Sequence, residues 1–409
     1  MKIGLLAYHS ACNFGATLQL LSTYMYLHNR GHEPIVINWI APDLEDMYRR
    51  STPVAQYNKQ EEVRKVIWRE TSLCRTTEDV AHTIDAEQLD AVIIGSDAVA
   101  QHHPLLERIS FPCRTVVGVR GFTTDTQFPN PFWATWLPLL KRPIPVAAMS
   151  VSNQDSAYKL FPKSVKQGMT ACVQRYSYIS VRDDWTQQMY AYLTNGQCVP
   201  PVTPDPVFAF NQNASSLLPT KQEILKRYNL PNAYLLLSFL PSKRPSVSQE
   251  WLNNFACQTA EAGKTCVLLP FSQKPSYGTL PHSIPLPLSP IDWYALIKYS
   301  SGYVGNNMHP IVVSLHNQVP FFSFDTYGTP HLNGLYVNEC SSKIKHILSA
   351  AGFLDYRVAS ISRRFTPPSV NMVLQKLNDF DTVSCKTFAD QYLNSYNQMM
   401  NELLKAISQ

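Results

Sequence analysis

The residues best suited to chemistry lie in the segment 302–328, which contains His309 between two apolar runs. Gly302 to Gly305 predicts a short strand, Pro310 to Asn317 a helix, and Val319 to Phe324 a second strand. This β-loop-α-β unit places His309 at the carboxyl end of a strand, the edge of an open α/β sheet where ligands bind. A helix N-terminus presents unpaired N–H groups, so a phosphate or carboxylate would be held well there. A helix-capping loop with a half-buried histidine is the alternative interpretation.

Polar residues also occur where other predicted strands end. They are Asn13, Asp97, Arg182 and Asp205, and the small residue Gly15 lies in the same loop as Asn13. The small residues around Gly15 allow the backbone to approach a ligand, and the planar guanidinium of Arg182 suits a phosphate or carboxylate. The structural alternatives are a turn cap for Asp97, a salt bridge for Arg182 and a rigid turn for Asp205, which lies between two prolines.

Strand-like runs alternate with helix-like segments along the whole chain, which predicts an α/β protein with parallel sheets. The predicted strands of the first part are 3–7, 34–37, 91–94, 145–149 and 178–181, and its helices are 17–27, 164–175 and 185–194. The polar segment 46–80 is expected to be an irregular insertion. After a proline cluster at 198–206 a second series begins, with helices at 221–227, 249–262 and 291–299 and strands at 233–239 and 265–271. We expect domains at 1–210 and 211–370, and a helical segment at 371–409 that packs back on the first domain.

Composition narrows the class of protein. The chain has 409 residues, 45% of them apolar and 16% charged, which is typical of a folded protein of two domains. The nine cysteines are scattered without a Cys-x-x-Cys pair, so we expect reduced thiols in a cytosol and no metal site. The N-terminus is expected to be a strand and not a signal peptide, and no apolar run approaches the ~20 residues of a transmembrane segment. The net charge of +5 is spread without a basic stripe, which argues against nucleic acid as a partner.

The strand-end motifs resemble, in order and spacing, those of the polysaccharide pyruvyl transferase family over most of the chain. The opening GLLAYHSACNFGATLQL is similar to the first strand and helix of that family, IIGSDAV to its Gly-Ser-Asp segment, and SVRD to its Ser-x-Arg-(Asp/Glu) segment. The pair Asp205-Pro206 also matches. The block LSPIDWYALIKYSSGYVGNNMHPIVVSLHNQVPFF resembles the family's helix, strand and histidine block.

The resemblance implies a GT-B-like fold, in which two Rossmann-like domains face one another across a cleft and a C-terminal helix returns to the first. It also implies transfer of a pyruvyl group from phosphoenolpyruvate to two hydroxyls of a sugar, in a surface polysaccharide or its lipid-linked precursor. By this resemblance the catalytic residues would be His309 and Asp97, the donor-binding residues Arg182, Asn306 and Asn307, and the acceptor-binding residues Asn13, Gly15 and Asp205. Phosphoenolpyruvate would be a co-substrate without a further cofactor. The protein would be cytoplasmic, with peripheral contact at the inner membrane face where the acceptor is lipid-linked.

The chain departs from the family at the donor side. Two residues before the histidine the family has arginine or serine, whereas this chain has Asn307. An asparagine carries no charge, so one charged contact worth ~1.5–3 kcal/mol would be missing. Ala98 to Gln101 likewise replace the family's Gln-x-Trp. Two alternatives therefore stand beside the enzyme: a non-catalytic relative that binds a glycan or a partner, and a nucleotide-sugar glycosyltransferase of the same architecture.

Overall fold

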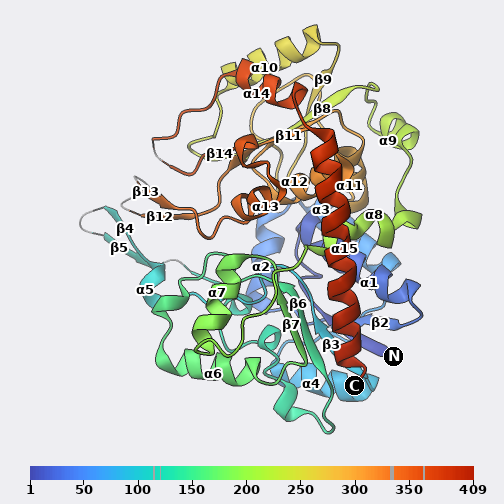
Figure 1. The fold of residues 1–409 in the computed structure, drawn as a ribbon, viewed down its shortest axis with the longest axis vertical. Helices are drawn as coiled ribbons and strands as arrows, with labels where there is room; N and C mark the ends of the chain where they lie inside the picture. Colours follow the sequence, from blue (N-terminus) through green and yellow to red (C-terminus); the bar gives the residue numbers. More distant parts are fainter. Residues whose placement is uncertain (114–115, 120, 332–335, 363) are drawn as a thin grey trace.

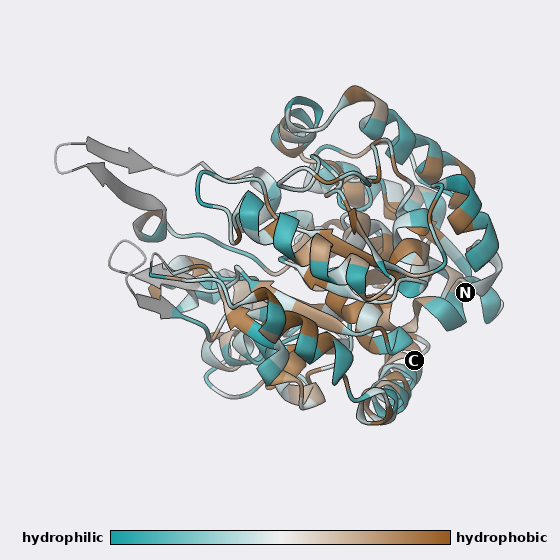
Figure 2. Cartoon of the chain, turned by 90° about the horizontal axis from the view of Figure 1, so that it is seen from above, coloured by the Kyte–Doolittle hydropathy of each residue, from teal (hydrophilic) through white to brown (hydrophobic). Residues whose placement is uncertain are grey.

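The computed structural model describes residues 1–409 except 114–115, 120, 332–335 and 363. The chain forms two α/β halves, one above the other, and each half is built on a five-stranded sheet (Figure 1). Hydrophobic residues gather in the interior of the molecule, and the outer helix faces are largely hydrophilic (Figure 2). The predicted pair of Rossmann-like sheets is confirmed.

The first sheet has the strand order β2-β1-β3-β6-β7, and each neighbouring pair is parallel. Its strands are β1 (Lys2–Leu6), β2 (Glu33–Val36), β3 (Ala91–Ile94), β6 (Val146–Val151) and β7 (Tyr178–Val181). β3 and β6 are buried along their whole length, as parallel strands covered on both faces are. The helices α1 (Phe14–Asn29), α4 (Thr77–Glu87), α6 (Lys163–Val173) and α7 (Asp184–Leu193) belong to this half, together with the short helix α5 (Leu105–Arg108) and the hairpin β4 (Ile109–Cys113) and β5 (Val116–Val119).

The second sheet has the strand order β14-β11-β10-β8-β9 and is also parallel. Its strands are β8 (Tyr234–Ser238), β9 (Thr265–Leu268), β10 (Tyr303–Gly305), β11 (Phe321–Asp325) and β14 (Arg357–Ala359). The accompanying helices are α9 (Lys221–Arg227), α10 (Gln249–Glu261), α11 (Pro290–Lys298), α12 (Met308–Asn317), α13 (Lys343–Ala351) and α14 (Val370–Asn378). A small hairpin, β12 (Thr329–His331) and β13 (Tyr336–Asn338), follows β11.

The last helix, α15 (Thr382–Ile407), runs alongside both halves and ends beside the first sheet (Figure 1). It contacts α12 in the second half and β6 and β7 in the first, and it buries Tyr396, Met399 and Leu403. The expected return of the C-terminal helix is confirmed. Among the residues that the structure describes, no helix has the length and apolar character needed to cross a membrane.

The segment 46–80 corrects one expectation, because most of it is helical and not irregular. It contains most of α2 (Pro42–Ser51), the whole of α3 (Val54–Ile67) and the start of α4. The helix α3 buries the polar residues Gln56, Gln60 and Arg64, so its sequence lacks the apolar stripe by which a helix is recognised. The amide of Gln56 exchanges two hydrogen bonds with the backbone of Leu288, at 3.0 and 2.7 Å, and so joins the halves.

An apolar core also continues from one half into the other. It includes the rings of Phe14 on α1 and Trp293 on α11, whose centroids are 5.4 Å apart. Beside it, the connection 206–213 forms the 3₁₀ turn Pro206–Ala209 and the short helix α8 (Phe210–Asn213). The loops at the carboxyl ends of the two sheets are therefore held against each other.

Candidate functional site

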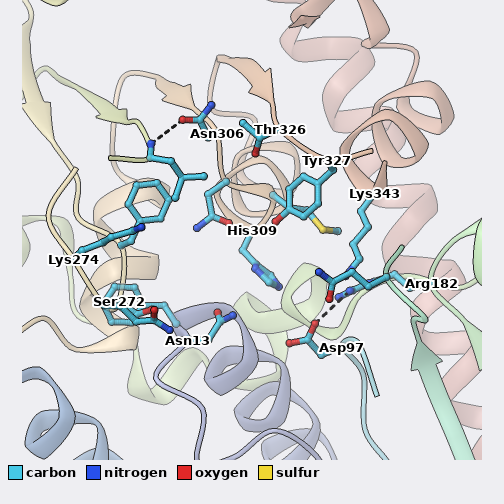
Figure 3. Close-up of a pocket in the computed structure, with 17 residues that line it drawn as sticks. Asn13, Asp97, Arg182, Ser272, Lys274, Asn306, His309, Thr326, Tyr327 and Lys343 are labelled. Carbon is cyan, nitrogen blue, oxygen red and sulfur yellow. Dashed lines mark hydrogen bonds and ion pairs between the residues drawn. The ribbon is translucent and has the colours of Figure 1, made fainter. Parts of the chain in front are cut away.

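A cavity of about 350 Å³ lies between the two halves, at the carboxyl ends of both sheets. We call it the donor cavity because Arg182, Asn306 and Asn307, the residues expected to bind the donor, line it. Asn13 and Asp97 reach it from loops of the first sheet and lie across from Asn306 and Tyr327 of the second, with His309 between them (Figure 3). The structure thus brings together most of the residues that the sequence singled out.

Arg182 enters this cavity directly after β7, with 3% of its surface exposed. Its Nη1 donates to Oδ2 of Asp205 at 2.7 Å, and its Nη2 lies 3.4 Å from Oδ1 of Asp97. Burial lowers the pKa of Arg182, but the carboxylates of Asp205 and Asp97 reverse this and raise it overall, so the guanidinium stays charged. Its Nε has no hydrogen-bond partner in the described part of the chain, which leaves a charged donor free for an anion.

Asp205 is not part of the cavity wall. It is 1% exposed, and its Oδ2 accepts hydrogen bonds from Arg182 and, at 2.6 Å, from Gln19. Its Oδ1 accepts from the backbone N–H of Val207 at 2.9 Å. Every one of these contacts fixes the carboxylate behind Arg182, where it holds the guanidinium in position.

His309 is the second residue of α12 and packs against Gly15 of α1. A Cβ atom built on Gly15 would lie 2.1 Å from Nδ1 of His309, so only glycine leaves room for the imidazole. The Nε2 atom of His309 is 3.9 Å from Asp205 and makes no hydrogen bond with any described residue. Burial lowers the pKa of His309 despite the opposing effect of Asp205 and Asp97, so the imidazole is neutral at pH 7.

Asp97 follows β3 with a φ of 91°, a backbone conformation that costs energy for any residue except glycine. Such strain concentrates at functional sites because the surrounding structure must enforce it. Burial tends to raise the pKa of Asp97, but Arg182, Lys343 and His309 hold it below its ordinary value. The carboxyl is therefore ionised at neutral pH.

The three asparagines have different environments. Asn13 caps α1 by accepting hydrogen bonds from the N–H groups of Gly15 and Ala16 at 2.9 and 3.4 Å. Asn306 is committed to the loops around it, since its amide bonds Leu240, Ser246 and Phe324. By contrast, Asn307 begins α12 without a side-chain capping bond and lines the cavity.

Lys343 is a cavity residue that sequence reasoning missed. It is 6% exposed and is the first residue of α13. Burial, reinforced by the charge of Arg182, lowers the pKa of Lys343 to about 8. Tyr327 and Lys274 complete the polar wall. Burial raises the pKa of Tyr327 to about 12, so its phenol keeps its proton.

Helix N-termini add to the positive character of the cavity. Phe14, Met308 and Lys343, all lining residues, are the first residues of α1, α12 and α13. Since α12 has no side-chain cap, its first N–H groups are available to an anion. The donor cavity is thus suited to a small molecule with several negative charges, beside one neutral imidazole and one carboxylate.

Solved structures with this fold include sugar-nucleotide enzymes. UDP-GlcNAc 2-epimerase from Neisseria meningitidis is similar with a TM-score of 0.55 and 9% identity, over 99% of this chain and 100% of that one. The 2-epimerase from Rickettsia bellii has a TM-score of 0.52 and 11% identity, over 100% and 97% of the two chains. Spinosyn forosaminyltransferase has a TM-score of 0.51 and 12% identity, over 100% of each. The chain therefore has a GT-B fold.

Among curated proteins, none matches this chain. The model of one protein family, polysaccharide pyruvyl transferase, matches residues 13–327. That range runs from the cap of α1 to Tyr327 and includes both Arg182, which follows β7, and His309 at the start of α12. The chain belongs to the polysaccharide pyruvyl transferase family.

Proposed function

We propose that this protein transfers the pyruvyl group of phosphoenolpyruvate to two hydroxyls of a sugar, in a surface polysaccharide or its lipid-linked precursor. The observation that carries the proposal is that Arg182 and His309 line one cavity with Lys343, and that each has a buried nitrogen, Nε and Nε2, without a partner among the described residues. Phosphoenolpyruvate carries a phosphate and a carboxylate close together. Such a ligand would bind both unpaired nitrogens. Its negative charges would also offset the repulsion between the cations of Arg182 and Lys343.

The donor would lie between Arg182, Lys343 and the start of α12. The guanidinium suits either anionic group of the donor, and the N–H groups of α12 would receive the other. Lys343 would supply the positive charge that Asn307 lacks. The amide of Asn307 would add an uncharged hydrogen-bond donor beside it. Asn306 would act indirectly, by holding the loops around the cavity.

His309 is suited to the proton transfer that this reaction needs. The neutral imidazole of the free protein would take up a proton when the donor arrives, because the negative charges of the donor raise its pKa. It could then protonate the methylene carbon of the donor, leaving a cationic centre at the adjacent carbon. The first sugar hydroxyl attacks this centre, phosphate departs, and the second hydroxyl closes the ketal.

The two hydroxyl protons must leave during this sequence. Asp97 is ionised and lines the cavity on the side of the first sheet, so it would accept a proton from the attacking hydroxyl. The departing phosphate takes the other. Asn13 would face the sugar, while Gly15 and Asp205, which the sequence assigned to the acceptor, would instead position His309 and Arg182. We place the reaction in the cytoplasm, where phosphoenolpyruvate is made.

The second candidate is a non-catalytic relative that binds a glycan, and the uncharged Asn307 favours it. The cationic wall formed by Arg182, Lys274 and Lys343 favours the enzyme. A glycan binder has no need for three cations within one small cavity, and a buried cation such as Lys343 is costly unless an anion binds beside it.

Phosphate release from phosphoenolpyruvate by the purified protein, measured across a panel of glycans, tests the proposal. We expect release with at least one glycan, a mass increase equal to one pyruvyl ketal, and loss of both in His309→Ala. His282→Ala changes an exposed histidine outside the cavity and is the matched control. No release with any glycan, together with no calorimetric binding of phosphoenolpyruvate, would contradict the proposal.

A further inference from the structure

A second cavity, of about 270 Å³, adjoins the donor cavity on the side of the first sheet. We call it the side cavity. Asn13, Asp97 and Gln154 line both cavities, so a molecule in one lies directly beside a molecule in the other.

The walls of the side cavity differ in charge from those of the donor cavity. Three carboxylates line it, those of Asp97, Asp125 and Asp155, and its described lining includes no lysine or arginine. Aromatic side chains complete the wall, among them Tyr8 and Tyr48. Carboxylate oxygens accept hydrogen bonds from hydroxyl groups and repel anions, and aromatic faces bury apolar carbon–hydrogen surface.

Asp125 is the residue that points most directly to a ligand. It is 2% exposed, and its Oδ2 accepts a hydrogen bond from the Tyr8 hydroxyl at 2.7 Å. Its Oδ1 is buried and has no hydrogen-bond partner of good geometry in the described structure. Burial raises the pKa of Asp125, and the hydroxyls of Tyr8 and Thr123 oppose this only in part. A buried acceptor without a partner is costly, and a ligand hydroxyl would remove that cost.

The loop that carries Asp125 is fixed in place before any ligand binds. Asn130 donates to the backbone carbonyl of Asp125 at 2.8 Å. The backbone N–H and the hydroxyl of Thr124 both donate to Asp43 of α2, at 2.8 and 2.9 Å. The free oxygen of Asp125 is thus preorganised, which lowers the entropy cost of binding.

We propose that the side cavity is the acceptor subsite and that it binds an uncharged sugar. Asp125 accepts a hydrogen bond from a ring hydroxyl of this sugar. Sugars that would place a phosphate or carboxylate in the side cavity are rejected. The shared residue Asp97 would then stand between the bound sugar and the donor. That the sugar is a pyruvyl acceptor rests on the proposed function, whereas the binding of a neutral sugar does not.

Saturation-transfer NMR with methyl glycosides tests this inference without requiring catalysis. The probes are methyl galactoside, methyl glucoside and methyl N-acetylmannosaminide, each compared with a counterpart that carries a 6-phosphate or a 6-carboxylate. We expect at least one neutral glycoside to bind about tenfold more tightly than its charged counterparts. Asp125→Asn should weaken the neutral glycoside by about tenfold without weakening the charged ones, because the amide oxygen would keep the hydrogen bond from the Tyr8 hydroxyl and the amide nitrogen, left toward the sugar, cannot accept one.

Asp155→Asn is the second variant, in case the buried Asp125 is needed for folding. Asp155 lines the side cavity and is half-buried, so its replacement should change the charge and little else. Charged glycosides should therefore bind more tightly to this variant than to the wild type. Asp46→Asn, at an exposed carboxylate of α2 outside both cavities, is the control and should change neither affinity.

Three results would overturn the inference: equal affinity for neutral and charged glycosides, a preference that both variants leave unchanged, or no neutral glycoside bound by protein that does bind phosphoenolpyruvate. Calorimetry with phosphoenolpyruvate on the same samples separates the two proposals. Neutral glycosides that bind in an Asp125-dependent way to protein that does not bind phosphoenolpyruvate would support the sugar subsite and contradict the pyruvyl donor.

Discussion

Replacing Gly15 by alanine should disable His309 although the histidine itself is unchanged. The new methyl group would lie 2.1 Å from Nδ1, 2.3 Å from Cε1 and 2.4 Å from Cγ of the imidazole. Non-bonded atoms of this kind settle at about 3.5–4.0 Å, so the ring must move by roughly 1 Å or more. A displacement of that size at a reacting group costs about 10²-fold in rate.

The same substitution should leave the protein folded. Gly15 is the second residue of α1, and alanine is favoured over glycine in a helix by up to ~1 kcal/mol. Overpacking opposes this gain and costs about 1–3 kcal/mol. We therefore expect the free energy of unfolding to fall by no more than about 2 kcal/mol.

The assay is phosphate release at saturating phosphoenolpyruvate and glycan, with circular dichroism and denaturant unfolding on the same samples. Gly302→Ala is the matched control, because a Cβ there meets its nearest atom at 3.4 Å, an ordinary contact, and the residue lies just before β10. A folded Gly15→Ala protein with wild-type turnover would refute the role given to His309. Equal losses in both variants would show a general effect of alanine and not a displaced imidazole.

Three further predictions concern the charges around the donor cavity. Lys343→Met should weaken calorimetric binding of phosphoenolpyruvate by about ten- to hundredfold through loss of a charged hydrogen bond, whereas Lys345→Met, on the exposed side of the same helix, should leave it unchanged. Because the pKa of Lys343 is lowered to about 8 and the anion binds the protonated amine, the affinity for phosphoenolpyruvate should fall as pH rises through about 8. A Lys343→Arg protein should keep its affinity over that range. An equal fall in both proteins would contradict the role given to Lys343. Asp205→Asn should lower the free energy of unfolding by about 3 kcal/mol in denaturant titrations, because Arg182 loses its closest buried countercharge, and a change near zero would show that Asp97 alone suffices.

The sequence was most informative where structure is decided locally. Strands at 91–94 and 178–181 and the helix at 221–227 have the predicted bounds, because short apolar runs and helical spacing reflect burial directly. The polar residues after these strands converge because parallel strands end at the same edge of a sheet. The helix α3 was missed because its buried face is made of the polar residues Gln56, Gln60 and Arg64, and the partners of the two glutamines are distant in sequence.

The site was predictable only in part, because several of its residues also depend on contacts with residues distant in sequence. Lys343 lies after the small hairpin that follows β11, and nothing in its neighbourhood marks it as a cavity residue. Asp125 likewise owes its place to the Tyr8 hydroxyl and to a loop held by Asn130. Asp205 was recognised as rigid, but its position behind Arg182 depends on Gln19, which no local pattern connects to it.

A crystal structure of the protein with bound phosphoenolpyruvate would show whether the donor lies between Arg182 and His309. We expect one donor molecule in the cavity between the two halves, with an anionic oxygen within hydrogen-bonding distance of Arg182 Nε, another near Lys343 Nζ, and the methylene carbon facing Nε2 of His309. Density for the donor outside this cavity, or within it but away from both Arg182 and His309, would contradict the account.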